Sequence, residues 1–221
     1  MEMESLESKL EKLGIDDDEK LEKHYKSSQK ILLVGEGDFS FAACLAKSFG
    51  SAANMVATSL DSAEMVKQKY LRAARNIDKL ETMGCRVVHG VNAHSMTSHP
   101  LLHQQVFDRI IFNFPHTTLK RSEANIRQIQ SHQRLVKGFL KSAGEMLAEK
   151  GEAHVTHKTC NPYNLWEIES LAEEVGLRLV EKVRFKQIDY HGYQNKRGFS
   201  LTRADETFHA GACLTYKFAK P

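Results

Sequence analysis

The residues best suited to chemistry begin with a glycine turn, Gly35-Glu36-Gly37-Asp38-Phe39, directly after the apolar run 31–34. Glycine lacks a Cβ, so the backbone there can bend tightly and approach a ligand closely. A dinucleotide-binding fingerprint would place a third glycine at position 40, where this chain has Ser40. The two acids of the turn would repel a pyrophosphate, but they suit a cationic amino group. The turn therefore predicts S-adenosylmethionine as the ligand.

Two polar residues follow later apolar runs. Asp61 comes after the run 55–60, where a carboxylate can accept hydrogen bonds from both ribose hydroxyls. The alternative is that Asp61 caps the next helix. Asn92 follows the run 86–91 and could hydrogen-bond the adenine, or it could be a turn residue. The full set expected to bind the cofactor is Gly35, Glu36, Gly37, Asp38, Phe39, Ser40, Asp61, Ser62, Asn92, Ala93 and Asn113.

The run 107–116, which reads FDRIIFNFPH, ends at the position from which base-modifying methyltransferases present a polar catalytic group. Asn113 could accept a hydrogen bond from a ring N–H or bind a ring carbonyl. His116 is a candidate proton acceptor because histidine titrates near neutrality, although it could instead stack on the base or only line the pocket. Pro115 completes the predicted catalytic set, and Phe114 would help to wall the pocket.

A third group of residues is suited to RNA. Aromatic side chains for stacking, beside cations for phosphate, are what single-stranded RNA binding requires. The alternatives are a solvated strand end at Lys158 and a late loop packed by its own tyrosines. The residues assigned to substrate binding are Phe114, Lys158, Tyr163, Tyr190, Tyr193, Lys196 and Arg197.

An alternation of strands and helices must position these residues. The continuous apolar run at 31–34 is typical of a buried parallel strand, and further strands are predicted at 55–60, 86–91, 107–114 and 152–158. Helical patterns follow the first glycine turn to about residue 48 and recur over 66–80, 129–147 and 162–175. Two last strands, near 178–185 and 212–218, have a polar loop between them in place of a helix.

Repeated strand-helix units predict an α/β, Rossmann-like class I methyltransferase fold with helices on both faces. The mostly parallel seven-stranded sheet should end in an antiparallel hairpin at one edge, because the last two strands have no crossover helix. We predict one such domain over residues 29–221. Residues 1–28, which include nine acids within the first 25 positions, are predicted to form an acidic helical appendage.

Composition excludes several classes of protein. In the 221 residues no apolar run approaches the roughly 18–20 needed to cross a bilayer, and the N-terminus has no signal-peptide pattern, so no membrane partner is expected. Four cysteines without C-x-x-C spacing suit a reducing compartment. His154, His157 and Cys160 cannot face one side of a strand together, and His99 and His103 lack a third ligand, so no metal is expected.

At this point the sequence resembles a known family, the eukaryotic large-subunit rRNA (uridine-N3)-methyltransferase-like proteins. The matching stretches are ILLVGEGDFSFAACLA (31–46), ATSLDS (57–62), FDRIIFNFPH (107–116), GEAHVTHKTCNPYNLW (151–166) and YHGYQNKRG (190–198). They span almost everything after residue 30. The chain departs from the family pattern at Asn92, where the family usually has Asp, at Thr117-Thr118-Leu119, and at His191, where the family commonly has Pro.

The resemblance implies S-adenosylmethionine as donor and N3 of a uridine in rRNA as acceptor. We therefore expect a monomeric enzyme with RNA as its partner, located in the nucleolus or nucleus, with the cytoplasm as the alternative. Two rival hypotheses are a non-catalytic RNA-binding module with this fold and a methyltransferase of small molecules. Donor binding separates the first from an enzyme, and steep salt dependence would separate RNA binding from the second.

Overall fold

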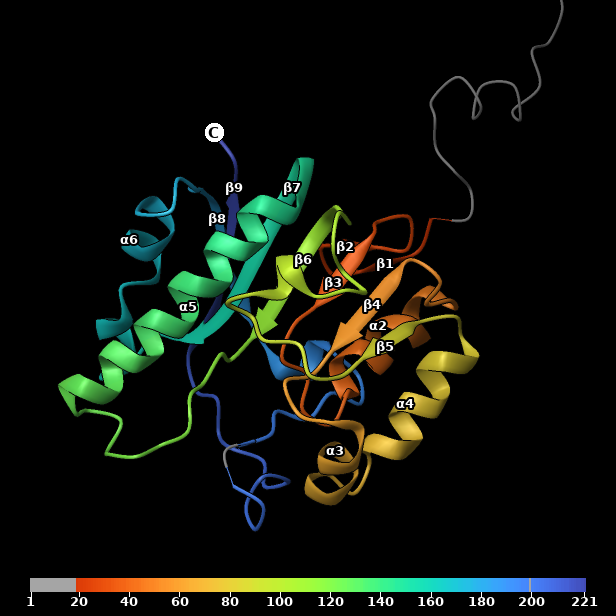
Figure 1. The fold of residues 1–221 in the computed structure, drawn as a ribbon, viewed down its shortest axis with the longest axis horizontal. Coiled ribbons are helices and arrows are strands. Elements are labelled where there is room, and N and C mark those ends of the chain that lie inside the picture. The colour runs from red at the N-terminus through yellow and green to blue at the C-terminus, as the bar shows by residue number, and fades with distance from the viewer. Residues whose placement is uncertain (1–18, 199) are drawn as a thin grey trace, which may run out of the picture.

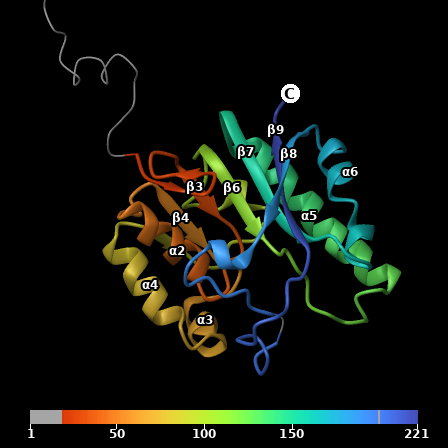
Figure 2. The same cartoon turned by 180° about the vertical axis from the view of Figure 1, so that it is seen from behind.

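In the computed structural model, which describes residues 19–198 and 200–221, a seven-stranded sheet carries helices on both faces (Figures 1 and 2). The strand order is β5-β4-β3-β6-β7-β9-β8. The strands are β3 (Ile31–Leu33), β4 (Met55–Thr58), β5 (Arg86–Val88), β6 (Phe107–Asn113), β7 (Leu147–Lys158), β8 (Arg178–Phe185) and β9 (Cys213–Ala219). All pairs from β5 to β7 are parallel, whereas β9 runs antiparallel to both β7 and β8. The predicted fold class is confirmed.

The helices divide between two cores, one on each face of the sheet. They are α2 (Ser40–Phe49), α3 (Ala63–Lys69), α4 (Ala73–Thr82), α5 (Ile126–Met146) and α6 (Ile168–Glu173). Leu32 of β3 packs into the core formed with α5 and α6, whereas its neighbours Ile31 and Leu33 pack into the core formed with α2 and α4. Successive side chains of a strand point to opposite faces, so a strand covered on both faces must be apolar throughout.

The helical pattern over 66–80 forms two helices, α3 and α4, instead of one. Tyr70 interrupts it in an extended conformation, with φ −132° and ψ 113°. The buried Tyr70 ring then lies beneath the glycine turn, where a Cβ added to Gly37 would be 3.3 Å from Tyr70 Cζ. The pattern over 162–175 is likewise divided at Glu167, which has φ +52°, into the 3₁₀ turn Tyr163–Trp166 and α6.

A short hairpin precedes the sheet. Its strands are β1 (Leu21–Glu22) and β2 (Tyr25–Lys26), and Tyr25 is buried with its hydroxyl 3.2 Å from Nδ1 of His154. The packed part of the domain therefore begins before residue 28, the boundary that the sequence predicted. The part of the predicted helical appendage that falls on residues 1–18 lies outside the described residues.

No helix in the described part of the chain combines the length and apolar character that a bilayer span requires.

Candidate functional site

A cavity of about 500 Å³ opens at the carboxyl ends of β3, β4 and β6. This is where doubly wound sheets bind ligands, at the point where the strand order reverses. Residues of all three predicted turns line it, together with Asn113 and the late loop 193–198. The members of the predicted cofactor set that line it are Gly35, Glu36, Gly37, Asp38, Asp61, Asn92, Ala93 and Asn113.

The other three members of that set do not line the cavity but hold the elements around it. Phe39 is fully buried with φ +60° at the start of α2, and Ser40 Oγ accepts a hydrogen bond from the backbone N–H of Gln194 at 2.9 Å. Ser62 caps α3, since its Oγ accepts from the N–H of Met65 at 3.3 Å. The structure shows the contacts of these three residues within the protein, and their contact with the cofactor remains a prediction.

Gly35 shapes the turn through both its conformation and its lack of a side chain. Its φ is +69°, in the left-handed region that favours glycine, and a Cβ there would lie 2.5 Å from Cε2 of Phe112. The ring of Phe112 therefore takes the place of a Cβ, and both residues line the cavity. A larger residue at position 35 would displace this ring.

Two acids of the turn lie in an environment that disfavours negative charge. Burial raises the pKa of Glu36 to about 8, and burial also raises the pKa of Asp38. Asp38 Oδ1 accepts from the N–H of Ser40 at 3.0 Å, while its buried Oδ2 has no hydrogen-bond partner among the described residues. Such a pair fits a ligand that brings a positive charge, as the amino group of S-adenosylmethionine does.

Glu36 gives the donor-free protein a testable pH dependence. In the folded protein the Glu36 carboxyl keeps its proton up to about pH 8, whereas an unperturbed glutamate titrates near 4.5. Between these values only the folded state binds the proton, so the free energy of unfolding falls as pH rises. Burial also lowers the pKa of His24, His132, His154 and His157 below the ordinary 6.5, so near pH 6.5 the unfolded state binds protons that the folded state does not, and this contribution makes stability rise with pH. Glu36→Gln keeps the histidine contribution, so between pH 6.5 and 8 we expect the wild-type slope to be more negative than that of the variant by up to about 1.4 kcal/mol per pH unit.

Urea unfolding over this pH range measures the slope. Glu36→Gln removes this titrating group but keeps the shape, and its slope should be less negative than that of the wild type. The matched control is Glu64→Gln, which changes an exposed glutamate in the first turn of α3 and should keep the wild-type slope. Equal slopes for Glu36→Gln and wild type would contradict the assignment.

Asp61 lies at the cavity wall and is already paired. Nζ of Lys69 lies 2.9 Å from Asp61 Oδ1 and 2.8 Å from Oδ2, and it also lies 3.5 Å from the carbonyl of Gly198 in the late loop. A carboxylate has about four acceptor sites, so it can still accept ribose hydroxyls. The helix cap next to it is Ser62, so the capping alternative for Asp61 does not apply.

Asn92 is a turn residue, which was the alternative to its predicted adenine-binding role. Its Oδ1 accepts a hydrogen bond from the N–H of His94 at 2.9 Å. The carbonyl oxygen therefore serves the turn, and the amide N–H groups remain the part of Asn92 that can face an adenine.

The predicted catalytic residues begin at the end of β6, where Asn113 lines the cavity. Both amide atoms of Asn113 are shielded, and neither has a hydrogen-bond partner among the described residues. Phe114 follows with φ +49°, a conformation that is costly for a bulky residue and that clusters at functional sites. Its N–H bonds the carbonyl of Thr156 in β7 at 2.8 Å, which holds the strained turn in place.

A smaller cavity of about 90 Å³ adjoins the first one. Seven of the predicted substrate or catalytic residues line it, namely Phe114, Pro115, His116, Lys158, Tyr163, Lys196 and Arg197. The two cavities share Phe114, His116, Lys196, Arg197 and Phe208. His116 therefore lies at the junction between the donor side and the side on which the substrate residues gather.

The predicted cations are held by partners within the domain. Lys158 Nζ lies 4.7 Å from the ring centre of Tyr163 and 4.8 Å from that of Phe208. Lys196 pairs with Asp205 at 2.8 Å and Arg197 with Glu206 at 3.2 Å. A phosphate would have to compete with these acids.

The two predicted tyrosines of the late loop differ in place. Tyr190 is buried and stacks on Phe185 of β8 with ring centres 5.4 Å apart, so it packs against the sheet. Tyr193 lines the larger cavity, on the donor side rather than beside Lys158.

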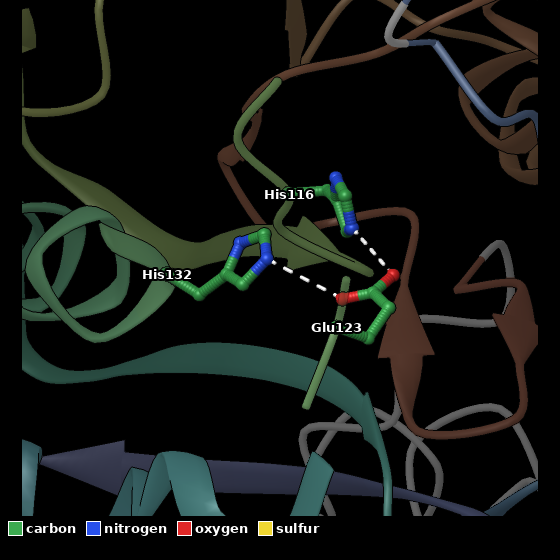
Figure 3. A group of neighbouring side chains, drawn as sticks. All are labelled: His116, Glu123 and His132. Atoms are coloured by element: carbon green, nitrogen blue, oxygen red, sulfur yellow. Dashed lines mark hydrogen bonds and ion pairs between the residues drawn. The ribbon is translucent and has the colours of Figure 1, made fainter. Parts of the chain in front are cut away.

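Sequence reasoning missed one cluster beside this site, formed by His116, Glu123 and His132 (Figure 3). Nε2 of His116 is 3.0 Å from Glu123 Oε1, and Nε2 of His132 is 3.4 Å from Glu123 Oε2. One nitrogen or oxygen atom from each residue lies within 4.8 Å of the others. Spacings of seven and nine residues match no motif, because the loop before α5 folds back onto the helix. The expected absence of a metal stays a prediction.

The fold and the cavity together define a class I S-adenosylmethionine-dependent methyltransferase. The model of one family, described as rRNA (uridine-N3-)-methyltransferase BTM5-like, matches residues 32–197. The chain belongs to this BMT5-like family.

Relatives agree with this membership. The uncharacterized protein At4g26485 of Arabidopsis thaliana is 48% identical, covering 91% of this chain and 98% of that protein. Heavy metal-associated isoprenylated plant protein 41 from the same plant is 45% identical over 91% of this chain, which spans only 39% of that protein. The 25S rRNA (uridine(2634)-N(3))-methyltransferase of Saccharomyces cerevisiae is 22% identical, over 78% of this chain and 67% of the yeast protein.

Solved structures support the fold. NSun6 from Pyrococcus horikoshii, solved with SFG, superposes with a TM-score of 0.57 at 13% identity. The match covers 88% of this chain and 48% of that one. At this identity the likeness concerns the fold alone.

Proposed function

We propose that this protein transfers a methyl group from S-adenosylmethionine to N3 of a uridine in large-subunit rRNA. The observation that carries the proposal is the amide of Asn113, shielded and without a hydrogen-bond partner among the described residues, at the end of β6. Buried polar groups are normally satisfied, so an orphan amide beside a cavity is explained by a ligand that completes it. The family description and the yeast relative's name support the uridine.

The chemistry of a uracil imide suits this end of the site. N3 carries a proton and has no available lone pair, so the proton must leave before or during attack on the methyl group. The amide of Asn113 offers an acceptor for the N3–H and a donor for a neighbouring ring carbonyl, and it would fix that edge of the base. S-adenosylmethionine supplies an electrophilic methyl group, and the protein's part is alignment in a site with little water.

The test is the nucleoside product. Large-subunit rRNA that lacks the modification is incubated with the full chain and the donor, digested, and its nucleosides are measured by mass spectrometry. We expect 3-methyluridine, formed less readily as salt increases, because contacts to phosphate weaken with salt. Donor consumption without 3-methyluridine would refute the uridine assignment. RNA binding without donor binding would favour a non-catalytic module, and a small acceptor methylated independently of salt would favour a small-molecule enzyme.

The place of action is part of the same proposal. We propose that the protein acts as a monomer in the nucleolus or nucleus, where an rRNA substrate would be met, with the cytoplasm as the alternative. A fluorescent fusion of the full chain tests this, and exclusion from both nuclear compartments would contradict the nuclear assignment.

A further inference from the structure

The cluster of His116, Glu123 and His132 brings together three segments next to the cavity junction. His116 ends the β6 motif, Glu123 lies in the following loop and His132 lies on α5 (Figure 3). The side chain of His132 is fully buried, while those of His116 and Glu123 are 22% and 27% exposed. Glu123 sits between the two rings, with one oxygen toward each.

The protonation of His132 follows from its backbone neighbour. The N–H of Thr117 donates to Nδ1 of His132 at 3.2 Å. A backbone N–H can only donate, so Nδ1 must carry a lone pair. Burial lowers the pKa of His132, so the ring is neutral and its proton is on Nε2, 3.4 Å from Glu123 Oε2. The amide nitrogen of Gln128 also lies 3.2 Å from this Nε2, but its two N–H groups have oxygen acceptors in Thr117 Oγ1 at 3.1 Å and the carbonyl of Thr118 at 3.3 Å.

Glu123 is an ionised acceptor for both rings. Burial alone would raise its pKa, but hydrogen bonds from His116 and His132 lower that pKa far below its usual range. With Oε2 turned to His132, Oε1 accepts from Nε2–H of His116 at 3.0 Å. A neutral imidazole has one N–H, so this tautomer of His116 carries its lone pair on Nδ1, the nitrogen on the side away from Glu123 (Figure 3).

We propose that Glu123, itself held by His132, is a positioning residue that fixes His116 as the tautomer whose Nδ1 accepts the substrate's ring proton. This inference rests on the proposed function. In the step, the N3–H bond breaks and its proton moves to Nδ1 of His116. The electron pair left on N3 forms the bond to the methyl carbon, and the carbon–sulfur bond breaks with its pair on sulfur. The imidazolium that results is stabilised by the carboxylate on its other side.

The same three side chains could instead be read as ligands of a divalent metal ion. A histidine that binds a metal through Nε2 usually donates its other N–H to an acceptor, which fixes the ring for the metal. In His132 the other nitrogen instead receives the N–H of Thr117, which leaves Nε2 protonated and unable to bind a metal. The geometry therefore favours the hydrogen-bonded relay, and the metal becomes an outcome of the test.

Glu123→Gln is the variant that decides. Glutamine has one acceptor oxygen and one NH₂ group, so it cannot accept from both rings. His132 keeps its Nε2–H because Thr117 fixes it, and it takes the amide oxygen. The NH₂ group then faces Nε2 of His116 and favours the opposite tautomer, with the proton on Nδ1. We expect kcat to fall by about 10²-fold, with the KM for the donor nearly unchanged, because a positioned base contributes this much or more.

The tautomer of His116 can also be measured directly by NMR, independently of catalytic activity. In ¹⁵N-histidine-labelled protein, with His116 assigned by a His116→Ala variant, nitrogen shifts should show Nε2–H in the wild type and Nδ1–H in Glu123→Gln. Glu123→Asp keeps two acceptor oxygens and should retain the wild-type tautomer and more activity than Glu123→Gln. The control is Glu145→Gln, an exposed change at the other end of α5, which should alter neither readout. Thermal unfolding of each variant verifies that it is folded.

The outcomes separate this inference from the proposed function. A wild-type His116 with its proton on Nδ1, or a folded Glu123→Gln with full kcat, would overturn the positioning role. So would one equivalent of zinc in the purified protein together with loss of activity on chelation. A wild type that shows the expected tautomer but makes no 3-methyluridine on unmodified rRNA would instead refute the uridine proposal.

Discussion

Replacing Asn113 by alanine is expected to lower the rate of methyl transfer by about 10²- to 10³-fold without lowering the melting temperature of the donor-free protein. The loss of rate follows because one preorganised polar contact to the reacting group is worth about that factor. Stability should not fall, because the amide atoms make no hydrogen bond to any described residue and their burial is a cost that alanine removes. Single-turnover kinetics and thermal unfolding give the two values.

The matched control is Asn54→Ala. The Nδ2 of Asn54 donates to the carbonyl of Ser27 at 3.0 Å, away from the cavity, so its loss should lower stability by about 0.5–1.5 kcal/mol and leave the rate unchanged. The two asparagines should thus respond with opposite patterns. An Asn113→Ala protein that melts well below wild type, or that keeps its full rate, would show that the amide is structural.

Gly35→Ala should destabilise the protein by about 2–5 kcal/mol and abolish donor binding at ordinary concentrations. A non-glycine residue at φ +69° costs about 1–2 kcal/mol, and forcing a methyl group against Phe112 costs about 1–3 kcal/mol more. If Phe112 yields, it moves at the wall of the cavity, so donor binding suffers along with folding. Urea unfolding and calorimetric titration with the donor are the measurements.

Gly176→Ala provides the comparison for strain alone. Gly176 has φ +78°, and a Cβ there would meet nothing within 4 Å, so only the conformational cost of about 1–2 kcal/mol applies. Donor affinity should remain that of the wild type. If both variants lose the same stability and bind the donor equally, the close approach of Phe112 to the turn has no importance for the site.

The central strands β3 and β4 are readable from the sequence because both are buried on both faces and are therefore almost entirely apolar. The antiparallel placement of β9 follows from the missing crossover helix before it. The helices are less readable. A helical period of apolar residues runs through Tyr70, but the Tyr70 ring packs beneath Gly37. This placement goes with an extended backbone at Tyr70, which divides the pattern into α3 and α4.

The site divides in the same way. Gly35, Asp61, Asn92 and Asn113 can be placed at the cavity from sequence because each lies at or within a few residues of the end of a parallel strand. The carboxyl ends of such strands meet at one edge of the sheet. Lys196 illustrates the limit of composition, because it looks like a cation for RNA but is buried against Asp205 with its side chain 8% exposed. Which charges face a ligand depends on neighbours that are distant in sequence or set by loop geometry.

The sequence by itself therefore determined the sheet, the donor turn and the residues at the end of β6, since these follow from local periodicity and from strand-end position. Only the tertiary structure decided the surroundings of His116. Glu123 and His132 lie seven and sixteen residues beyond it, without a motif, and they meet it because the loop after the strained Phe114 returns to α5. The contacts of Glu123 with the two histidines depend on distances of 3.0 and 3.4 Å that no residue pattern encodes.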